Sequence, residues 1–404
     1  MIHSYFDLSQ DEVLVQGRKI SEWAAAGKGG TPFYLYHSVV IEKKIQELRK
    51  NLPKEIQIHY AVKANPMPEL VSFMAGWVNG FDVASTRELQ LVIGSGMPAK
   101  EISFAGPGKT DDELTLAISE QVLIYAESIH EIRRIAGLSK RLNTPARLGL
   151  RINPQFDMKS SGLRMGGGSK AFGIDSEQVP EVCVEVATLG LEIEGVHIFA
   201  GSQNLDAQTI CQTIRLSFAL VKSMSSLFLN SLRVFNFGGG LGIPYFENDK
   251  AVDVVAIGKT LFQEVPDFLR VYPRAVPVIE LGRFLVGECG LFVSRIVDIK
   301  ISRGQKFLVL DGGMNCHLAA TGNLGQVIKR NFPLCVGNRL QSSVREVVNV
   351  VGPLCTPLDT FATQVELTLS EVGDLVVIFQ SGAYGLTASP SQFLSQRVAR
   401  EIFI

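Results

Sequence analysis

Paired cysteines, long apolar runs and an excess of charge of one sign are all missing from this sequence of 404 residues. Lys and Arg number 39 against 40 for Asp and Glu, which gives no field that would attract nucleic acid or an anionic membrane. No apolar run approaches the roughly 20 residues that cross a bilayer, and "MIHSYFDLSQDEV" has no basic segment followed by an apolar one. We therefore expect a cytoplasmic protein, without a nucleic-acid or membrane partner, that acts on a small molecule.

The cysteines are scattered, without C-x-x-C pairs or neighbouring histidine pairs. Neither a disulfide framework nor a zinc site is indicated, and we expect no bound metal. Low-complexity segments and linkers rich in Pro, Gly or Ser are also missing. The six cysteines are Cys183, Cys211, Cys289, Cys316, Cys335 and Cys355.

Short apolar runs alternate with helix-like stretches from about residue 31 to residue 275. The helix-like stretches, such as "SVVIEKKIQELRKNL", repeat their apolar residues every three or four positions. Eight such alternations over 31–275 predict an α/β fold with a (β/α)8 barrel of the TIM type. The expected strands are "FYLY" at 33, "IHYAVKA" at 58, "GFDVAS" at 80, "ISFAG" at 102, "LIYAES" at 123, "ARLGLRINP" at 146, "EGVHIFAG" at 194 and "RVFNFGGG" at 233.

The pattern changes after residue 275. "VPVIELGRFLVGECGLFVSRIVDIKISRGQKFLVLDGG" and "DLVVIFQSGAYG" are rich in Val, Ile and Phe and show few helical periods. We therefore expect an antiparallel β domain over 276–404, after the barrel of 31–275. The N-terminal segment, 1–30, is expected to pack with the β domain.

The expected strand "IHYAVKANP" ends on a lysine, Lys63. Apolar residues alternate along the strand, and Asn65-Pro66 stops it. Lys63 either extends its ammonium into water from a buried stem or is a buried amine of lowered pKa that forms a Schiff base. Active sites of barrels lie at the carboxyl ends of the strands, and Lys63 lies at that end of the expected second strand.

A glycine run in "FNFGGGLGIPY" follows the expected eighth strand. Gly238, Gly239 and Gly240 let backbone N–H groups approach an anion closely, although such glycines also serve tight turns. Ser202 in "FAGSQN", after the expected seventh strand, adds a hydroxyl. In barrels the loops after strands seven and eight often hold phosphate.

A lysine and a phosphate-binding turn at one barrel mouth point to pyridoxal 5′-phosphate, whose aldehyde needs an amine. The pyridine nitrogen of this cofactor needs a further group. "VIELGRF" offers Glu280 at the end of an apolar run, where an unpaired carboxylate would be costly. A carboxylate in that place would keep the ring nitrogen protonated and favour carbanion chemistry.

The motifs in this order resemble the fold-type III pyridoxal phosphate decarboxylases, the family of diaminopimelate, ornithine and arginine decarboxylases. This resemblance implies the alanine racemase-like fold and covers essentially the whole chain. It rests on "TPFYLY" (31–36), "YAVKAN", "GFDVAS", "GGGLG", "ELGR", "GPLCTPLD" (352–359) and "GAYG" (382–385).

The resemblance implies a role for each matching residue. Lys63 would bind the cofactor as a Schiff base, and Glu280 would pair with the pyridine nitrogen. Cys355 would enter the site from the partner subunit and help control protonation of the intermediate, which implies a homodimer with shared active sites. The other implied cofactor-binding residues are Asp82, Phe199, Ser202, Gly238, Gly239, Gly240, Gly282, Arg283 and Tyr384, and the candidate substrate-binding residues are Arg151, Asp311, Thr356 and Asp359.

Several of these residues also have simpler explanations. Asp82 in "GFDVAS" is suited to cap the following helix, and Tyr384 is suited to the core of the β domain. Asp311 and Asp359 are equally suited to closing turns. Arg151 in "LRINP" either reaches the site or pairs with a structural carboxylate.

Two positions near the cofactor depart from the family pattern. Phe199 replaces the histidine that stacks on the cofactor ring; a phenyl ring can stack there but cannot donate a hydrogen bond or carry charge. His197, two residues earlier on the same strand face, is expected in the core or behind the site. Leu281 replaces the proline of E-P-G-R and leaves Glu280 and Arg283 in place.

A third departure concerns the substrate. Thr356 follows Cys355, where diaminopimelate decarboxylases have a glutamate and ornithine-type enzymes an aspartate, and a hydroxyl cannot neutralise a distal ammonium. "FAGSQNLDA", "RMGGGSKAFGID" and "GPLCTPLD" are similar to a subgroup found in secondary-metabolite, siderophore and exopolysaccharide pathways. That subgroup includes the decarboxylase of glutamate tethered to an acyl-carrier protein.

We therefore expect α-decarboxylation of an L-amino acid or an amino-acid conjugate, carrier-tethered or of siderophore type, with release of carbon dioxide and an amine. The alternative is a decarboxylase of diaminopimelate or another free basic amino acid. Racemases of this fold pair the ring nitrogen with arginine, so Glu280 speaks against one. A noncatalytic regulatory relative is opposed by the retention of Lys63, the glycine run, Glu280 and Cys355.

Overall fold

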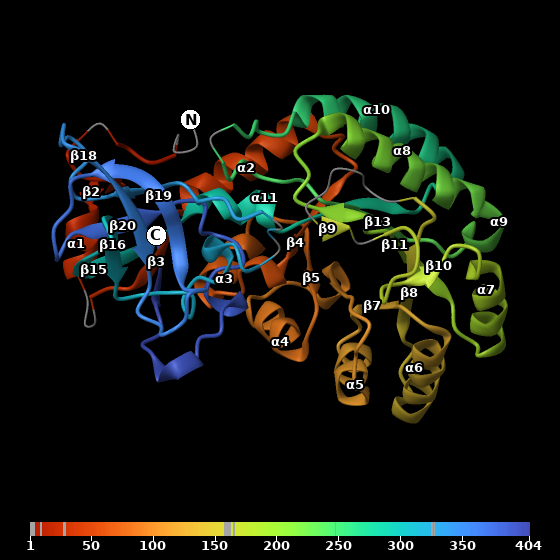
Figure 1. Cartoon of the computed structure of the whole chain (residues 1–404). Coiled ribbons are helices and arrows are strands. Elements are labelled where there is room, and N and C mark those ends of the chain that lie inside the picture. Colours follow the sequence, from red (N-terminus) through yellow and green to blue (C-terminus); the bar gives the residue numbers. More distant parts are fainter. Residues whose placement is uncertain are drawn as a thin grey trace. The chain divides into compact units, whose positions relative to one another are not determined.

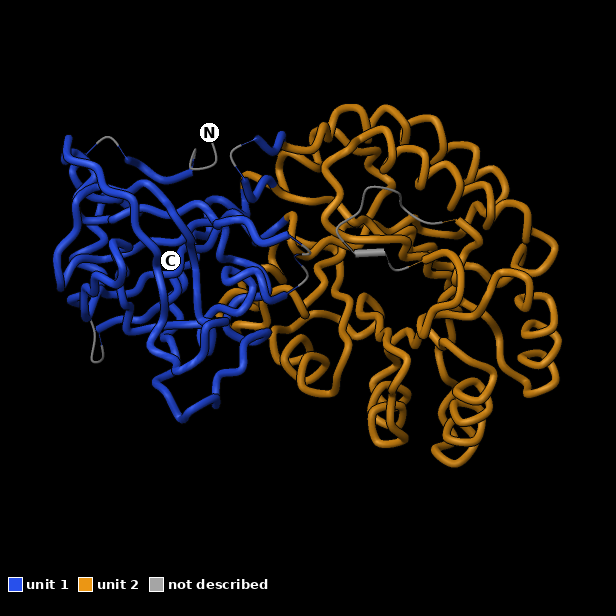
Figure 2. The backbone as a smooth tube through the Cα atoms, in the orientation of Figure 1, with its two compact units in different colours: residues 1–42, 244–250, 285–404 blue, residues 43–243, 251–284 orange. Residues whose placement is uncertain are grey.

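The computed structural model describes residues 5–8, 10–26, 30–156, 163–164, 166–246, 248–324, 326 and 328–404. Residues 1–4 and 27–29 of the expected N-terminal segment, and Met165 of the motif "RMGGGSKAFGID", lie outside these residues. The chain forms two compact units, shown in Figure 2. Unit 1 comprises residues 1–42, 244–250 and 285–404, and unit 2 comprises residues 43–243 and 251–284.

Unit 2 is a closed parallel barrel (Figure 1). Each strand of the ring pairs in parallel with its two neighbours, and the pairing of β7 with β8 closes the ring. A further short strand, β10 (Ile174–Asp175), pairs with β8. The ring consists of β4 (Gln57–Ala61), β5 (Gly80–Val83), β6 (Ile102–Phe104), β7 (Leu123–Ala126), β8 (Arg147–Asn153), β11 (Ile193–His197), β13 (Val234–Gly239) and β14 (Val276–Leu281).

Polar caps fix where the barrel helices begin. Ser85, Thr110 and Ser128 each accept a hydrogen bond from the backbone N–H three residues later, and Asp206 and Asp253 cap two longer helices. The helices line the outside of the ring in Figure 1. In chain order they are α2 (Ser38–Asn51), α3 (Pro68–Ala75), α4 (Thr86–Gly94), α5 (Asp111–Ser119), α6 (Ile129–Leu142), α7 (Val179–Thr188), α8 (Ala207–Ser223), α9 (Ser225–Phe228) and α10 (Val254–Val271).

The assignment of "FYLY" to the barrel is wrong. This segment is β3 (Phe33–Tyr36), which pairs with β15 and β21 in the sheet of unit 1. The barrel instead takes β14, the "VPVIEL" run that was assigned to the β domain, so its strands begin at residue 57 and end at residue 281. Lys63 therefore follows the first barrel strand rather than the second, and the glycine run ends the seventh. Both strands are buried on both faces, and such runs do not reveal the sheet to which they belong.

Unit 1 is built on a mostly antiparallel sheet of eight strands, in which the pairs β16–β18 and β3–β21 are parallel. Described residues of the N-terminal segment, including Phe6, Val13 and Ile20, share a core with β3 and β15. Besides β3, the strands are β15 (Gly290–Ser302), β16 (Gln305–Leu310), β17 (Leu334–Val336), β18 (Arg345–Val351), β19 (Thr360–Thr368), β20 (Leu375–Ile378) and β21 (Arg400–Phe403). The smaller elements before and after β3 are β1 (Leu14–Val15), β2 (Arg18–Lys19), α1 (Ile20–Ala25) and α11 (Arg283–Val286).

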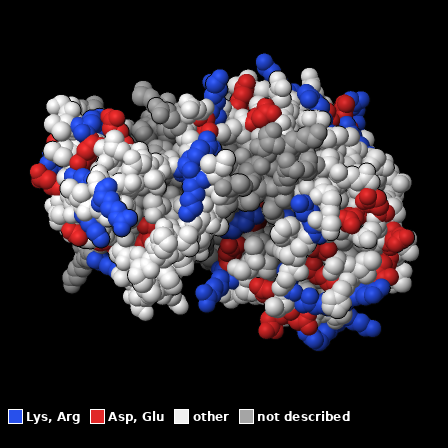
Figure 3. Space-filling model, viewed as in Figure 1, with Lys and Arg blue, Asp and Glu red and all other residues white. Residues whose placement is uncertain are grey.

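Acidic and basic side chains are interspersed over the face shown in Figure 3, as the near balance of charges suggests. Among the described residues, none of the helices has both the length and the apolar character that a membrane span requires. Within the same residues, His, Cys, Asp and Glu form no group of three or more that could hold a metal ion.

His317 is a buried titratable group in unit 1. Its Nε2 lies 3.0 Å from the Ser381 hydroxyl, and its ring packs against Tyr34, Phe292 and Phe332. Burial lowers the pKa of His317 to about 3. Below the ordinary histidine pKa of about 6.5, the unfolded chain therefore binds a proton that the folded chain does not bind.

We expect His317→Asn to weaken the acid sensitivity of the fold. Between pH 7.5 and pH 5, protonation of the unfolded histidine costs the wild type about 2 kcal/mol of unfolding free energy, and the asparagine variant avoids this loss. Urea unfolding at the two pH values measures the difference. His130→Asn, at an exposed position, is the control and should keep the wild-type dependence. Identical pH dependence of the unfolding free energy in all three proteins would contradict the lowered pKa of His317.

Candidate active site

Lys63 and Glu280 lie together at the carboxyl ends of neighbouring barrel strands. β4 ends at Ala61, and the single 3-10 turn Val62–Ala64 carries Lys63. β14 pairs in parallel with β4 and carries Glu280 near its end. The Lys63 Nζ lies 3.3 Å from Glu280 Oε1, with the lysine side chain 46% exposed and the glutamate side chain 4% exposed. An accessible amine thus sits beside a buried carboxylate.

Glu280 is held in its charged form by its neighbours. Burial alone would raise its pKa, but the ammonium of Lys63, the adjacent imidazole of His197 and the charge of Arg151 together lower the pKa below the ordinary value. His197 Nε2 lies 3.1 Å from Glu280 Oε2, and Tyr125 packs against the imidazole with ring centroids 4.9 Å apart. His197 therefore occupies the carboxylate oxygen that Lys63 does not contact.

Phe199 lies beside the lysine. The Lys63 Nζ is 5.3 Å from the centre of the Phe199 ring, and the same ring lies 6.2 Å from that of His197. The imidazole of His197 thus lies behind the carboxylate, while a phenyl ring faces the amine. The expectation that His197 lies behind the site agrees with these contacts.

The glycine run forms a tight turn at the end of β13. Gly238 and Gly240 have φ of +72° and +74°, which favours glycine. A Cβ at Gly239 would meet the Glu280 carbonyl oxygen at 2.2 Å, so the turn also packs too closely against β14 for a side chain. Asn236 holds the turn by accepting a hydrogen bond from Gly238 N at 2.9 Å.

Ser202 and Asp82 occupy different surroundings. Ser202 ends the short strand β12 (Gly201–Ser202) and is half-buried. Asp82 is buried inside the barrel, where Oδ1 accepts hydrogen bonds from Ser103 Oγ and from Asn236 Nδ2. His59 Nδ1 lies 3.7 Å from Asp82 Oδ2. The alternative that Asp82 caps α4 is wrong, because Ser85 caps that helix.

Arg151 is buried and pairs with a carboxylate that the sequence did not reveal. Its Nη1 donates to Glu127 Oε1 at 3.0 Å, and its guanidinium lies 5.0 Å from the ring of Phe172. Glu127 also accepts hydrogen bonds from the backbone of Gly106 and Gly173. Of the two alternatives for Arg151, the contacts favour pairing with a structural carboxylate, from which its charge also acts on Glu280.

Gly282 lets the end of β14 approach the turn that carries Lys63. A Cβ at this position would lie 2.9 Å from the Cβ of Ala64 and 3.3 Å from the carbonyl oxygen of Ala61. Arg283 follows directly and begins α11. The glycine of "ELGR" therefore sets the separation between Glu280 and Lys63.

The remaining candidates lie in unit 1. Asp311 accepts hydrogen bonds from Thr31 Oγ1, Ser294 Oγ and Arg295 N, so its carboxylate closes local structure. Tyr384 is half-buried and has φ of +53°. These observations give neither Asp311 nor Tyr384 a contact with substrate or cofactor.

Asp359 closes the loop between β18 and β19. Its Oδ1 accepts from Met314 N at 2.5 Å and its Oδ2 from Leu354 N at 2.8 Å. Burial raises the pKa of Asp359, and these hydrogen bonds partly oppose the rise. Cys355 in the same loop is exposed, and the Thr356 hydroxyl accepts from Leu358 N at 3.3 Å.

The groups of unit 2 fit pyridoxal phosphate by their chemistry. Lys63 offers an amine for the aldehyde, and Glu280 offers a buried carboxylate, held ionised, for a protonated ring nitrogen. The turn at Gly238–Gly240 carries no side chains and has positive φ at Gly238 and Gly240, which suits backbone binding of a phosphate. A (β/α)8 barrel with this set of groups defines a pyridoxal phosphate enzyme.

Comparison with known proteins gives the family. Residues 39–287 match "Pyridoxal-dependent decarboxylase, pyridoxal binding domain". The chain is 35% identical to the L-glutamyl-[BtrI acyl-carrier protein] decarboxylase of Niallia circulans, over 92% of this chain and 88% of the relative. It is 32% identical to the 2-[(L-alanin-3-ylcarbamoyl)methyl]-2-hydroxybutanedioate decarboxylase of Staphylococcus aureus, over 90% and 91% of the two chains.

A solved structure agrees with these relatives. Diaminopimelate decarboxylase from Helicobacter pylori, complexed with L-lysine, superposes with a TM-score of 0.84 at 27% identity, over 95% of this chain and 93% of that one. The chain therefore belongs to the pyridoxal-dependent decarboxylase family. It is a pyridoxal phosphate-dependent carboxy-lyase with the alanine racemase-like fold.

Sequence reasoning missed Asn236, Glu127 and His59. The role of Asn236 could have been predicted, because a polar residue two positions before a glycine run can hold the turn with its side chain. Glu127 directly follows β7 in "LIYAES", and no sequence feature paired it with Arg151. The contact between them depends on the ring of strands.

We expect Gly282→Ala to disturb the cofactor site more than the fold. The added methyl group would collide with Ala64 and move Lys63 away from Glu280, at a cost of about 1–3 kcal/mol in unfolding free energy. Cofactor titration followed by absorbance should show weaker binding by at least tenfold. Gly137→Ala is the control, because Gly137 lies in α6 with open space around it and gains up to about 1 kcal/mol from helix propensity. Equal cofactor affinity in both variants would refute this explanation of Gly282.

Proposed function

We propose that this decarboxylase acts on an amino acid whose side chain is joined to a larger group, rather than on a free diamino acid. The observation that carries this proposal is the absence of a carboxylate available to a substrate in the loop over residues 352–359. Its only acidic residue, Asp359, is buried and uses both carboxylate oxygens on backbone N–H groups. Thr356 offers a hydroxyl where a distal ammonium would need a carboxylate. This loop therefore lacks a carboxylate for the far ammonium of a free diamino acid.

The names of the relatives support the same substrate class. The Niallia circulans enzyme is named for glutamate on an acyl-carrier protein, and the Staphylococcus aureus enzyme for an amino acid joined by an amide to a hydroxybutanedioate. In both cases the reacting amino acid carries a large group at its far end. We place the substrate of this chain in that class.

The groups described above suggest how the chain would hold its cofactor. Lys63 would bind the aldehyde, Glu280 would face the ring nitrogen, and Phe199 would lie against the ring. Asp82 would lie nearby, within its hydrogen-bonded cluster. The phosphate would be held by Gly238, Gly239, Gly240, Ser202 and Arg283, with Gly282 setting the approach of Arg283.

The work of the protein side chains is to orient groups and to hold protons. When bound, pyridoxal phosphate supplies a ring that accepts the electron pair left by carbon dioxide. Glu280 would hold a proton on the ring nitrogen, with His197 and Arg151 favouring its ionised form. We assign delivery of a proton to the α-carbon to Cys355, acting from the partner subunit of a homodimer.

We expect Lys63→Ala to remove turnover and cofactor absorbance together. Loss of the amine leaves the aldehyde without its anchor, so kcat should fall by at least about 1,000-fold. Spectra and release of carbon dioxide from the same preparation test both effects. Lys54→Ala changes an exposed lysine of the same unit and should behave as wild type. Turnover by Lys63→Ala without added amine would overturn the assignment.

A substrate panel tests the proposed class. Wild-type protein loaded with pyridoxal phosphate is incubated with free lysine, ornithine, arginine, meso-diaminopimelate and glutamate. It is also incubated with glutamyl carrier protein and with the amide of 2,3-diaminopropionate and citrate. Mass spectrometry records loss of carbon dioxide. We expect one conjugate to exceed every free amino acid in kcat/KM by at least about 100-fold. Faster turnover of a free amino acid would refute the proposal.

A further inference from the structure

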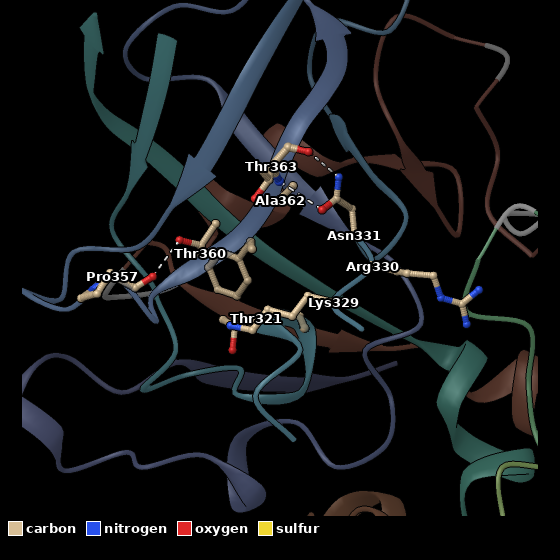
Figure 4. Close-up of a pocket in the computed structure, with 10 residues that line it drawn as sticks. Thr321, Lys329, Arg330, Asn331, Pro357, Thr360, Ala362 and Thr363 are labelled. Atoms are coloured by element: carbon tan, nitrogen blue, oxygen red, sulfur yellow. Dashed lines mark hydrogen bonds between the residues drawn. The ribbon is translucent and has the colours of Figure 1, made fainter. Parts of the chain in front are cut away.

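A pocket of about 210 Å³ lies in unit 1, and all of its lining residues belong to that unit. Its walls come from the 3-10 turn Ala319–Thr321, from residues 329–331 and from the start of β19, as Figure 4 shows. The lining residues are Ala320, Thr321, Lys329, Arg330, Asn331, Pro357, Thr360, Phe361, Ala362 and Thr363. None of these residues belongs to the amine and carboxylate site of unit 2.

The pocket is joined to the loop that carries Cys355. Pro357, two residues after Cys355, forms part of its wall. Asn323 links the two features: its Nδ2 donates to Leu358 O at 2.9 Å and to Thr321 Oγ1 at 2.7 Å. The Asn323 Oδ1 accepts a hydrogen bond from Lys329 Nζ at 2.7 Å. One amide thus holds the loop, the pocket wall and the lysine in a fixed arrangement.

The charge of the pocket is positive. Its lining contains Lys329 and Arg330 and no carboxylate. The ammonium of Lys329 has three N–H donors, and its hydrogen bond to the neutral Asn323 side chain leaves two of them for a ligand. Lys329 has no ion-pair partner among the described residues.

Arg330 contributes at the rim. Its side chain runs away from Thr360 and Thr321 in Figure 4, and its guanidinium stacks 3.5 Å above the centre of the Phe246 ring. Asp249 lies 3.8 Å away and balances this one charge. The charge of Lys329 is therefore the one left for a ligand.

Three neutral polar side chains of the pocket are already used. Thr321 donates to Leu318 O, Thr360 donates to Pro357 O, and the Asn331 amide exchanges two hydrogen bonds with the backbone of Thr363. A ligand would therefore find one ammonium as its main donor, in a pocket walled by Phe361, Ala362 and Pro357. This combination favours an oxyanion attached to a small carbon skeleton.

We infer that this pocket binds the oxyanion at the far end of the conjugated substrate. The inference rests on the proposed function, in which Cys355 acts at the α-carbon. Pro357 and Lys329 line the same pocket, so a substrate that extends from Cys355 past Pro357 would meet the Lys329 ammonium. The oxyanion is a carboxylate in a citrate amide and a phosphate in the arm of a carrier protein, and both meet the same ammonium.

The test compares Lys329→Gln with Lys329→Arg, which keeps the charge. Lys300→Gln removes a charge from an exposed position on β15 and is the matched control. Steady-state kinetics use cofactor-loaded protein, the two conjugates of the panel and the citrate amide with its far carboxylates blocked as amides. Calorimetry with citrate and with inorganic phosphate measures binding without turnover.

We expect Lys329→Gln to raise KM about tenfold for the conjugate that turns over, with kcat within twofold, because a charge-assisted hydrogen bond is lost. Lys329→Arg and Lys300→Gln should stay within about threefold of wild type, and the blocked analogue should lose its dependence on residue 329. Loss of citrate binding alone identifies carboxylate as the ligand, and loss of phosphate binding alone identifies phosphate.

Two results overturn the inference in distinguishable ways. If a conjugate turns over and its KM is the same in Lys329→Gln as in Lys300→Gln, the pocket does not hold the substrate, while the proposed function stands. If free amino acids turn over faster than either conjugate in the wild type, the proposed function fails and the inference fails with it.

Discussion

The negative charge of Glu280, buried inside the barrel, is the constraint on which the site depends. Transfer of a carboxylate from water to a protein interior costs several kcal/mol unless hydrogen bonds and opposite charges compensate it. Lys63, His197 and Arg151 provide that compensation from three different strands or strand ends, and Glu127 in turn balances Arg151. The polar interior of this barrel is thus a connected set of charges arranged around one carboxylate. Loss of Lys63, His197 or Arg151 would weaken the compensation of the buried Glu280 charge.

The same constraint explains the tolerance of Phe199. A second imidazole facing the amine is not needed to keep Glu280 ionised, because His197 already contacts its other oxygen. The phenyl ring leaves stacking intact and removes one titratable group from the surroundings of Lys63. His197 and Arg151 therefore add to the support that Lys63 gives the carboxylate.

Local patterns predicted most of the barrel, because alternating apolar strands and amphipathic helices depend on short-range periodicity. The exceptions were β3 and β14, both buried along their whole length, whose sheet depends on pairings between distant segments. Lys63, Glu280 and the glycine run were visible as residues of special chemistry at strand ends. Asn236, His59 and Glu127 were not, because their importance lies in contacts across the ring. The use of Asp359 on backbone N–H groups likewise required coordinates.

The pairing of β3 with β21 has a consequence for synthesis on the ribosome. These strands lie near opposite ends of the printed sequence, yet they are parallel neighbours in one sheet, and β3 also pairs with β15. The barrel segments are complete at residue 284, before most of unit 1 has been translated. While the barrel is being synthesised, β3 and its apolar neighbours therefore lack their partner strands. We expect a chaperone to bind this early segment during that time.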